Sequence, residues 1–281
     1  MKKQYFSQSL SDSLCSLSIE IEALGNTIVS REKKCKEITF ALIEIFDPTD
    51  LHIQIQARKF KFLYAISEFM WYLSCDRQTK NIGKLAKIWT EISDEKGEVV
   101  SNYGNIVREQ WDRTVNELVS DRNSRRATLT INTPSNKKEN KLDCPCTMSV
   151  QFLIRNGKLD VFVNMRSNDL IFGFCNDVFC WCLFQQMMLN ELNAKGVGVE
   201  LGSYIHFAGS LHVYERHFEL LKKCSVQEKT PKGKMKLEKH FTWEYAEKNN
   251  KIMTTQNASK EELEMSAIQF FAKEINRDKY T

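Results

Sequence analysis

One cysteine in this chain lies among residues that together could modify an electron-poor ring. Cys146 belongs to the run DCPCT at residues 143–147, and Arg166 follows it twenty residues later in the run RSND. Asp169 closes that run, and Asp177 follows it. A thiolate could add to the ring, an arginine could hold an anion nearby, and a carboxylate could recognise the polar edge of the ring. The alternative for Cys146 is a buried structural thiol, which is the commoner role of a cysteine.

The nine cysteines indicate reduced thiols rather than a disulfide framework. Their number is odd, and their spacing is not that of a disulfide framework. The N-terminus lacks an apolar signal core, and no run approaches the roughly 18 apolar residues of a membrane helix. We therefore expect a cytoplasmic protein with no membrane segment. Only one residue separates Cys144 from Cys146 and Cys180 from Cys182, whereas zinc sites usually place about two to four residues between paired cysteines. We expect no metal.

The composition fits an enzyme that binds small anions. The chain has 281 residues, of which 42% are hydrophobic, and this is enough for one large domain or two small ones. Its formal net charge is only +4, so the charge balance does not require a nucleic-acid partner.

A hairpin is predicted to bring the cysteine and the arginine together. Residues 150–154 and 159–164 are β-rich runs on either side of RNGK, and an Asn-Gly pair in such a position favours a tight turn. Cys146 would enter the first strand and Arg166 would leave the second, so that both could line one pocket.

The hydrophobic pattern predicts the elements around that hairpin. Residues 8–24 and 62–73 indicate helices, and residues 38–45 indicate a strand. A basic loop is expected at residues 31–36. Residues 177–192 form a long apolar run that predicts a helix, with Asn176 or Asp177 near its N-cap. Within the helix at 62–73, Glu68 is either a buried acid with a partner or a carboxylate turned to solvent.

Two polar stretches are expected at the surface. Residues 133–142 indicate a loop, and residues 223–281 form a charged C-terminal extension with few apolar anchors. Residues 261–275 within it predict a surface helix. The sequence assigns no role to this extension.

Several separated motifs resemble, in order and spacing, the thymidylate synthase family and, within it, the deoxycytidylate hydroxymethylase branch. The resemblance runs from about residue 30 to about residue 217. The segments that carry it are residues 88–89 (IW), 101–104 (SNYG), 124–126 (SRR), 163–169 (VNMRSND), 172–174 (FGF), 176–177 (ND) and 209–214 (GSLHVY).

The resemblance implies an α/β (α+β) fold with three layers. A large mixed sheet would pack against helices and form the interface of a homodimer. Residues 1–281 would form a single catalytic domain, with an N-terminal helix in residues 1–29.

The implied reaction is a one-carbon transfer to a pyrimidine nucleoside monophosphate. In the resemblance, the thiolate of Cys146 adds to C6 of the base, which makes C5 nucleophilic toward the methylene group of 5,10-methylenetetrahydrofolate. Arg166 would lower the pKa of the thiol. Glu68 matches the family's catalytic carboxylate, and Tyr103 matches a residue near the reacting ring.

The resemblance also assigns phosphate binding. Arg166 and Ser167 would hold the phosphate within one subunit, and Arg125 and Arg126 would reach in from the partner subunit. Arg31 lies where the family carries an N-terminal phosphate arginine. From the residues alone, a solvated pair is the alternative for the two adjacent arginines.

The sugar and the folate are assigned to other motifs. His212 and Tyr214 match the pair that binds the sugar 3′-hydroxyl, although a histidine of the core is the alternative for His212. Trp89, Asp169 and Gly173 match positions at the folate.

Asp177 is expected to select the base, and Asn168 belongs to the same nucleotide-binding stretch. Uracil-using members carry asparagine where this chain has Asp177, and a carboxyl group suits the N3 and N4 edge of cytosine. Thr147 replaces a usual histidine, Ile92 replaces a tryptophan, and the C-terminal sequence lacks the family's short apolar end. These departures resemble the branch in which water, rather than hydride, completes the reaction.

The expected activity is therefore hydroxymethylation of dCMP at C5. Three alternatives stay open: a hydroxymethylase for CMP, a thymidylate synthase that methylates dUMP, and a catalytically inactive module that binds nucleotides or RNA. The absence of a basic patch interleaved with aromatic residues argues against a nucleic-acid partner. The source and pathway, the sugar preference and the role of the C-terminal residues stay open.

Overall fold

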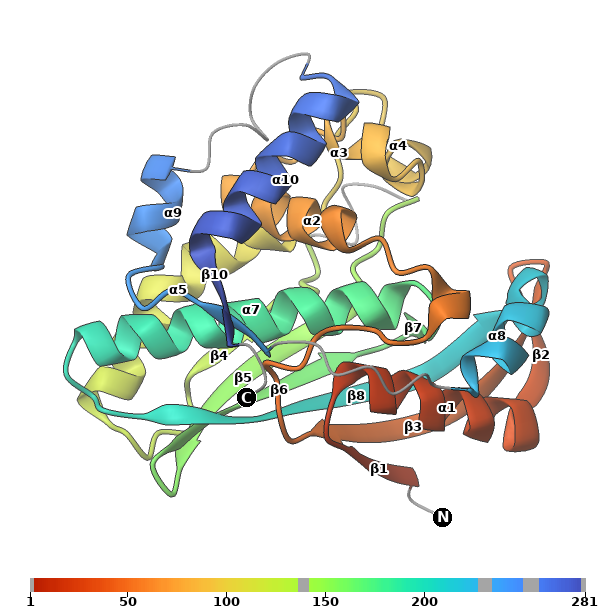
Figure 1. Cartoon of the computed structure of the whole chain (residues 1–281), viewed down its shortest axis with the longest axis horizontal. Coiled ribbons are helices and arrows are strands. Elements are labelled where there is room, and N and C mark those ends of the chain that lie inside the picture. Colours follow the sequence, from red (N-terminus) through yellow and green to blue (C-terminus); the bar gives the residue numbers. More distant parts are fainter. Residues whose placement is uncertain (1–2, 136–141, 227–233, 250–257, 279–281) are drawn as a thin grey trace.

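A computed structural model describes residues 3–135, 142–226, 234–249 and 258–278 of the protein. Within these ranges, eight strands form one mixed sheet with the order β1-β3-β8-β6-β5-β4, while β2 pairs with β3 and β7 pairs with β8 (Figure 1). The strands are β1 (Lys3–Ser7), β2 (Asn26–Ser30), β3 (Lys33–Ile45), β4 (Thr128–Thr130), β5 (Thr147–Arg155), β6 (Lys158–Met165), β7 (Asn168–Asp169) and β8 (Glu200–Tyr214).

Two layers of helices stack on this sheet (Figure 1). The layer on the sheet contains α1 (Leu10–Leu24), α7 (Gly173–Ala194) and α8 (Phe218–Cys224). The outer layer contains α2 (Phe62–Ser74), α5 (Tyr103–Ser120) and α10 (Lys260–Glu274). The expected α/β fold of three layers is confirmed. Shorter elements complete the described chain: η1 (Gln56–Arg58), α3 (Ile82–Leu85), α4 (Ile88–Ile92), η2 (Glu215–His217), β9 (Lys234–Leu237), α9 (Trp243–Asn249) and β10 (Ile275–Asp278).

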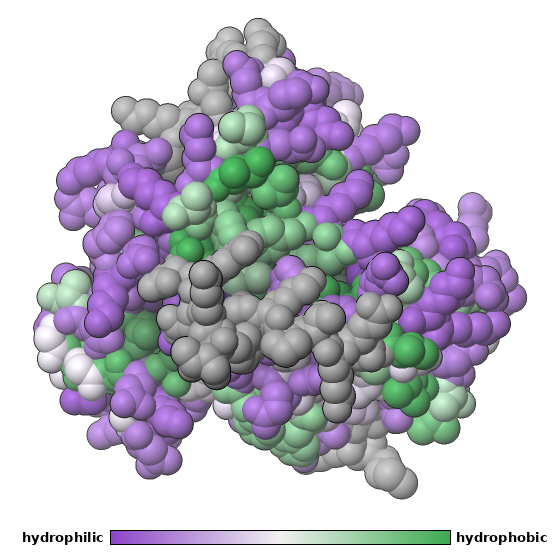
Figure 2. Space-filling view, in the orientation of Figure 1, coloured by the Kyte–Doolittle hydropathy of each residue, from purple (hydrophilic) through white to green (hydrophobic). Residues whose placement is uncertain are grey.

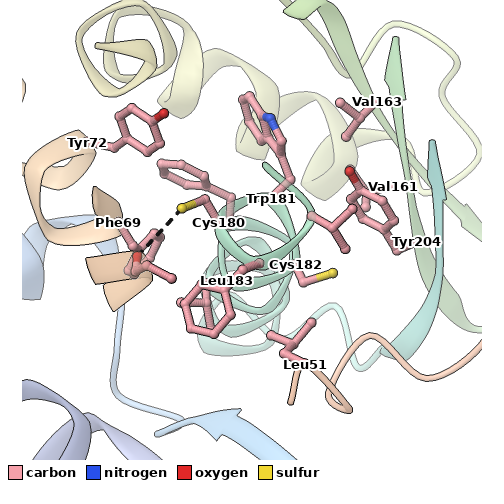
Figure 3. Close-up of a cluster of buried hydrophobic side chains, with 14 of the residues drawn as sticks. Leu51, Phe69, Tyr72, Val161, Val163, Cys180, Trp181, Cys182, Leu183 and Tyr204 are labelled. Carbon is pink, nitrogen blue, oxygen red and sulfur yellow. Dashed lines mark hydrogen bonds between the residues drawn. The ribbon is translucent and has the colours of Figure 1, made fainter. Parts of the chain in front are cut away.

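Helix α7 forms the centre of the core, and most of its side chains are buried around its whole circumference. Figure 3 shows its residues Cys180, Trp181, Cys182 and Leu183 pointing in different directions into the cluster. Residues of α2 lie on one side of the helix, and residues of β6 and β8 lie on another. The helix therefore connects the sheet to the outer layer. No helix among the described residues is long and apolar enough to cross a membrane.

The predicted hairpin is confirmed. Strands β5 and β6 pair in antiparallel fashion, and Asn156 and Gly157 in the turn have positive φ angles of 52° and 75°. Both residues tolerate that region, which is why Asn-Gly suits a two-residue turn. Cys146 immediately precedes β5, and Arg166 immediately follows β6. The backbone N–H of Arg166 donates to the carbonyl of Cys146 at 2.9 Å.

Two local predictions were wrong. The basic segment is a loop only at Arg31 and Glu32, whose φ angles are 47° and 63°, because β3 already starts at Lys33 and buries Cys35. Helix α7 starts at Gly173, so Asn176 and Asp177 lie inside the helix rather than at its N-cap. The burial of Phe174 and Cys175 favours this earlier start.

The C-terminal extension has more apolar anchors than expected. Leu263, Ala267 and Phe270 are buried at helical spacing in α10, which packs on α2. Phe241 and Trp243 are also buried. Charged neighbours hide this stripe in the sequence, and Figure 2 likewise shows hydrophilic residues around most of the rim of this face. Of the predicted loop at residues 133–142, residues 136–141 lie outside the described ranges.

Candidate active site

The hairpin places a guanidinium beside the thiol of Cys146. The Nη2 atom of Arg166 lies 3.6 Å from the Sγ atom of Cys146. The same guanidinium donates to the carbonyls of Cys144 at 2.8 Å and Pro145 at 3.1 Å. Burial raises the pKa of Cys146 to about 11, and the positive charge of Arg166 acts in the opposite direction. The arginine therefore favours the thiolate.

Buried hydrogen bonds hold the loop that carries the thiol. Asp143 is 2% exposed, and its carboxylate accepts from the backbone N–H of Ser101 at 2.8 Å and from its hydroxyl at 2.5 Å. The side chain of Asn132 donates to the carbonyl of Pro145 at 2.8 Å. Neither Asp143 nor Asn132 was predicted to have a role. The position of Asp143 directly before Cys144 could have indicated its role, whereas Asn132 had only its place after β4.

Asp177 is hydrogen-bonded to Asn168, and its charge acts on the thiol of Cys146. The Nδ2 atom of the buried Asn168 donates to Oδ2 of Asp177 at 2.8 Å. Burial raises the pKa of Asp177 to about 7. Its negative charge contributes to the raised pKa of Cys146, whereas Asn176 acts on Glu68 and lowers the pKa of that carboxyl group. Asp177 and Asn176 therefore act on different groups of the site.

Gly173 leaves room for this polar pair. A Cβ atom at this position would lie 3.1 Å from Nδ2 of Asn168 and 3.6 Å from Oδ2 of Asp177. Close approach to these two side chains is the role that the geometry gives to Gly173.

Glu68 is a buried acid, so the solvent-facing alternative is wrong. It is 5% exposed, and its Oε1 atom accepts from the hydroxyl of Tyr72 at 3.3 Å. Burial and the negative charge of Asp177 raise its pKa to about 8, although the polar side chains of Tyr64, Tyr72 and Asn176 oppose the rise. Its Oε2 atom is buried without a hydrogen-bond partner in the described part of the chain. Such an atom suits a proton-transfer role.

Replacing Glu68 with glutamine is expected to stabilise the folded protein as the pH rises. The folded-state pKa of about 8 lies above the ordinary value of 4.5, so ionisation of Glu68 weakens folding between about pH 4.5 and pH 8. The glutamine variant should gain up to about 5 kcal/mol over this window, since each pKa unit corresponds to about 1.4 kcal/mol. Thermal unfolding of both proteins at pH 5 and pH 9 measures the difference. If the difference in unfolding temperature between the two proteins does not increase from pH 5 to pH 9, Glu68 is not a buried group with a raised pKa.

Aromatic side chains pack together beside these acids. The ring of Tyr103 stacks on Tyr72 and Trp181 at centroid distances of 5.5 Å and 6.0 Å, and its hydroxyl accepts from the backbone N–H of Thr147 at 3.4 Å. Trp89 is 9% exposed and packs against Trp71 at 4.7 Å. A flat ligand ring could therefore pack near the thiol.

Strand β8 brings His212 and Tyr214 to the same end of the sheet. Their rings lie 4.9 Å apart, edge to face, and Nδ1 of the buried His212 has no hydrogen-bond partner among the described residues. Asp169 lies opposite His212 in the pairing of β7 with β8. It also accepts from the backbone N–H groups of Ile171 and Phe172, at 2.8 Å and 3.4 Å. Asp169 therefore stabilises the turn that leads into α7.

The remaining predicted arginines are exposed. The Nε atom of Arg126 pairs with Glu117 at 3.0 Å, and the backbone carbonyl of Arg125 accepts from Gln151. These contacts place both residues beside α5 and β5. Arg31 lies in the turn before β3, where its charge opposes the burial that raises the pKa of Tyr214. Ser167 is half-buried between Arg166 and Asn168.

Sequence reasoning missed Arg58, which supports the start of α7. This arginine is 5% exposed, and its Nε atom donates to the carbonyl of Ile171 at 2.5 Å. Its guanidinium lies 4.3 Å from the ring centroid of Phe172. A lone arginine after an apolar run carried no recognisable motif.

All nine cysteines are free thiols. The described ranges contain no cluster of three or more histidine, cysteine, aspartate or glutamate side chains that could hold a metal ion.

Comparison with known proteins identifies the family. The thymidylate synthase family model matches residues 21–267. The chain is 39% identical to deoxycytidylate 5-hydroxymethyltransferase of Enterobacteria phage T4 over 171 residues, which cover 56% of this chain and 69% of the relative. It is 30% identical to deoxyuridylate hydroxymethyltransferase of Bacillus phage SP01 over 207 residues, or 68% of this chain and 53% of the relative. A putative thymidylate synthase of Methanocaldococcus jannaschii is 32% identical over 197 residues, or 68% and 82%. The chain belongs to the thymidylate synthase family, whose enzymes transfer a one-carbon unit to C5 of a pyrimidine nucleotide and use methylenetetrahydrofolate as co-substrate.

Proposed function

We propose that this transferase hydroxymethylates dCMP at C5. The observation that carries the proposal is the hydrogen bond between Asp177 and Asn168, at 2.8 Å, in a pair whose carboxylate also acts electrostatically on Cys146. The cytosine edge presents an amino donor at N4 and an acceptor at N3. A carboxyl group whose pKa is about 7 can accept from N4 and share a proton with N3. The amide oxygen of Asn168 is also buried without a partner among the described residues, which leaves an acceptor for the same edge.

The other residues of the site suit covalent catalysis. Cys146 forms a bond to C6, and Arg166 stabilises the thiolate before attack and after release. The addition makes C5 a nucleophile for the one-carbon unit of methylenetetrahydrofolate. Glu68 lies within the same group of acids and has a raised pKa, so it suits the proton transfers that follow loss of the C5 proton.

Two residues support water as the final reactant. The hydroxyl of Thr147 is buried and lacks a partner within the described ranges, so it could bind a water molecule. Ile92 is only half-buried, and its smaller side chain would shield the C5-methylene group from water less than a tryptophan would. Addition of water to C5-methylene gives the hydroxymethyl group and leaves tetrahydrofolate unoxidised.

The remaining binding assignments follow the same proposal. Arg166, Ser167 and Arg31 would contact the phosphate, and His212 and Tyr214 would contact the sugar. Trp89 and Asp169 would lie at the folate, with Tyr103 next to the base. The free nucleophilic thiol suits the cytoplasm, where thiols stay reduced.

We also propose that residues 1–281 act as one catalytic domain. Helix α10 packs on α2, the helix that carries Glu68, so the C-terminal segment supports the site directly. This packing gives the C-terminal extension a structural role.

The product distinguishes the proposed reaction from its rivals. The purified protein would be incubated with methylenetetrahydrofolate and dCMP, CMP or dUMP, and each product weighed by mass spectrometry. A dCMP product heavier by CH2O supports the proposal. Addition of CH2 to dUMP would instead indicate a thymidylate synthase, and turnover of CMP alone would indicate a ribonucleotide enzyme.

We further propose a homodimer in which Arg125 and Arg126 complete the partner's phosphate site. Both arginines are exposed in the single chain. The half-buried side chains of Leu153, Phe162 and Ile205 line a hollow on the sheet, and a second copy could cover it.

Mixing two inactive variants is expected to restore activity if the sites are shared. One protein carries Cys146→Ser, and the other carries Arg125→Ala with Arg126→Ala. In an equal mixture, random exchange makes about half of the dimers mixed, and each mixed dimer has one intact site and one inactive site. The expected activity is therefore about a quarter of that of wild type. The mixture is refolded together and assayed with dCMP, and each variant refolded alone is the control. No recovery from dimers shown to contain both variants would contradict shared sites.

A further inference from the structure

The carbonyl oxygen of Pro145 accepts hydrogen bonds from two distant parts of the chain. The Nδ2 atom of Asn132, which follows β4, donates to it at 2.8 Å. The Nε atom of Arg166, which follows β6, donates to it at 3.1 Å. A carbonyl oxygen has two lone pairs, so it can accept both bonds at once. One oxygen atom therefore joins Asn132 to the guanidinium beside the thiol.

The backbone of residues 143–146, here called the cysteine loop, holds the guanidinium of Arg166. Besides its bond to Pro145, the guanidinium donates through Nη2 to the carbonyl of Cys144 at 2.8 Å. The same Nη2 atom lies 3.6 Å from Sγ of Cys146. A guanidinium is planar and carries its N–H groups in a fixed fork. Its orientation toward the thiol therefore depends on the directions in which the two carbonyls point.

The side chain of Asn132 is well placed to fix the Pro145 carbonyl. Asn132 is 8% exposed, and its backbone N–H donates to the carbonyl of Met148 at 3.2 Å, which ties it to β5. Because a carbonyl can only accept, the side-chain amide must turn its NH2 group toward Pro145. The same Nδ2 atom lies 4.0 Å from Sγ of Cys144. The amide group is therefore directed at the cysteine loop.

A second anchor holds the start of the cysteine loop. The carboxylate of Asp143 accepts from the backbone N–H and the hydroxyl of Ser101, at 2.8 Å and 2.5 Å. This anchor remains when Asn132 is replaced. We therefore expect the loop to keep its place in such a variant, and the change to concern the direction of the Pro145 carbonyl.

We propose that Asn132 is a positioning residue for Arg166 and Cys146. By holding the carbonyl of Pro145, its amide directs the guanidinium toward the thiol. The inference rests on the proposed function for its consequence in catalysis, but the hydrogen bonds that carry it belong to the free protein.

The position of the guanidinium matters because of its charge. The titratable and charged groups that act on Cys146 are Asp143 and Cys144 of the loop, Tyr103 of α5, Arg166 after β6, Asp177 of α7 and Tyr214 of β8. Burial raises the pKa of Cys146, and the positive charge of Arg166 opposes this rise. A guanidinium that turns away therefore leaves less thiolate at a given pH.

Alkylation of Cys146 by iodoacetamide in the free protein is the direct test. Rate constants would be measured between about pH 7 and pH 9 by mass spectrometry of the tryptic peptide 142–155, in which fragment ions distinguish Cys146 from Cys144. Asn132→Ala is expected to slow the reaction about 3- to 10-fold at each pH, since the thiolate fraction changes tenfold per pKa unit. A loop that had only loosened would expose the thiol and speed the reaction, so the sign of the change separates the two effects.

A double variant tests whether Asn132 acts through the arginine. Arg166→Gln removes the charge and should slow alkylation more than Asn132→Ala does. In the Arg166→Gln background, Asn132→Ala should have no further effect. If Asn132→Ala does not fold, Asn132→Ser takes its place, because a serine hydroxyl is one bond shorter than the amide and should release the same carbonyl.

Asn190 provides the matched control. It is also 8% exposed, and its Nδ2 atom donates to the carbonyls of Glu238 at 2.8 Å and Phe241 at 3.0 Å. Asn190→Ala thus removes a comparable buried amide that is bonded to the C-terminal segment rather than to the cysteine loop. It should lower the unfolding temperature about as much as Asn132→Ala and leave the alkylation of Cys146 unchanged.

Steady-state kinetics with dCMP tests the consequence for catalysis. Asn132→Ala should lower kcat by about the same factor as the alkylation rate and move the kcat profile to higher pH, because both depend on the thiolate. KM for methylenetetrahydrofolate should stay near its wild-type value. A loss of kcat with an unchanged pH profile would contradict a role in positioning the guanidinium.

Two results with the free protein would overturn the inference. One is alkylation of Cys146 in folded Asn132→Ala at the wild-type rate or faster. The other is a slowing by Asn132→Ala that persists in full in the Arg166→Gln background. Since neither measurement requires turnover, both stand apart from the proposed function, which fails instead when wild-type protein does not convert dCMP.

Discussion

Serine at position 146 is expected to abolish turnover and leave nucleotide binding almost unchanged. The guanidinium of Arg166 lies 3.6 Å from the thiol of Cys146. Nucleophilic attack requires the thiolate form of Cys146. A serine hydroxyl ionises far less readily, and no group in this geometry is placed to remove its proton as efficiently. The loss in kcat should be roughly 10⁴-fold or more, as for other enzymes deprived of their nucleophile.

The measurement compares kcat with the dissociation constant for dCMP. Calorimetric titration of dCMP should give Cys146→Ser an affinity within a few-fold of wild type, because the base and phosphate contacts come from other residues. Cys144→Ser is the matched control, since Arg166 binds the backbone carbonyl of Cys144 rather than its thiol. Substantial turnover in Cys146→Ser would contradict covalent catalysis by this residue. A comparable loss in Cys144→Ser would mean that the loop, not the nucleophile, had been damaged.

Asparagine at position 177 is expected to transfer most of the activity from dCMP to dUMP. An amide can donate to O4 and accept from N3–H of uracil, whereas cytosine presents the reverse pattern. Mismatched groups at a buried polar edge lose their hydrogen bonds, which can cost about 10³- to 10⁴-fold in kcat/KM. The product should remain a hydroxymethyl nucleotide, because Thr147 and Ile92 are unchanged.

Competition between the two nucleotides measures the change in preference. Wild type, Asp177→Asn and Asn176→Ala would each be given dCMP and dUMP in one mixture. Asn176 interacts with Glu68, so Asn176→Ala should alter the pH dependence and keep the preference for dCMP. If Asp177→Asn still prefers dCMP, or if Asn176→Ala changes the preferred base, Asp177 is not the residue that recognises the base.

The hairpin and the central helix were predictable because their signals are local. Asn156 and Gly157 are two of the few residues that adopt left-handed backbone at low cost, and the β-rich runs on both sides leave one register for the turn. The order of the family motifs then predicted that Asp177 recognises the base, and this role stays a prediction. In the structure Asp177 accepts a hydrogen bond from Asn168, a residue of the same predicted nucleotide-binding stretch.

The contacts inside the site depend on residues far apart in the chain and could not be predicted in the same way. The burial of Glu68 follows from packing between α2 and α7, and its interaction with Asp177 spans more than one hundred residues. The hydrogen bond from the indole of Trp89 to the hydroxyl of Tyr64 similarly joins α4 to α2. In the C-terminal segment, charged neighbours concealed the stripe of Leu263, Ala267 and Phe270 that anchors α10.

Tritium release from C5 tests the central claim most directly. The protein would be incubated with C5-tritiated dCMP and methylenetetrahydrofolate, and dihydrofolate absorbance would be followed in the same tube. We expect tritium release without formation of dihydrofolate, because water rather than hydride completes the reaction. Release coupled to dihydrofolate, or release from C5-tritiated dUMP but not from dCMP, would contradict the assignment of Asp177 and of the hydroxymethyl product.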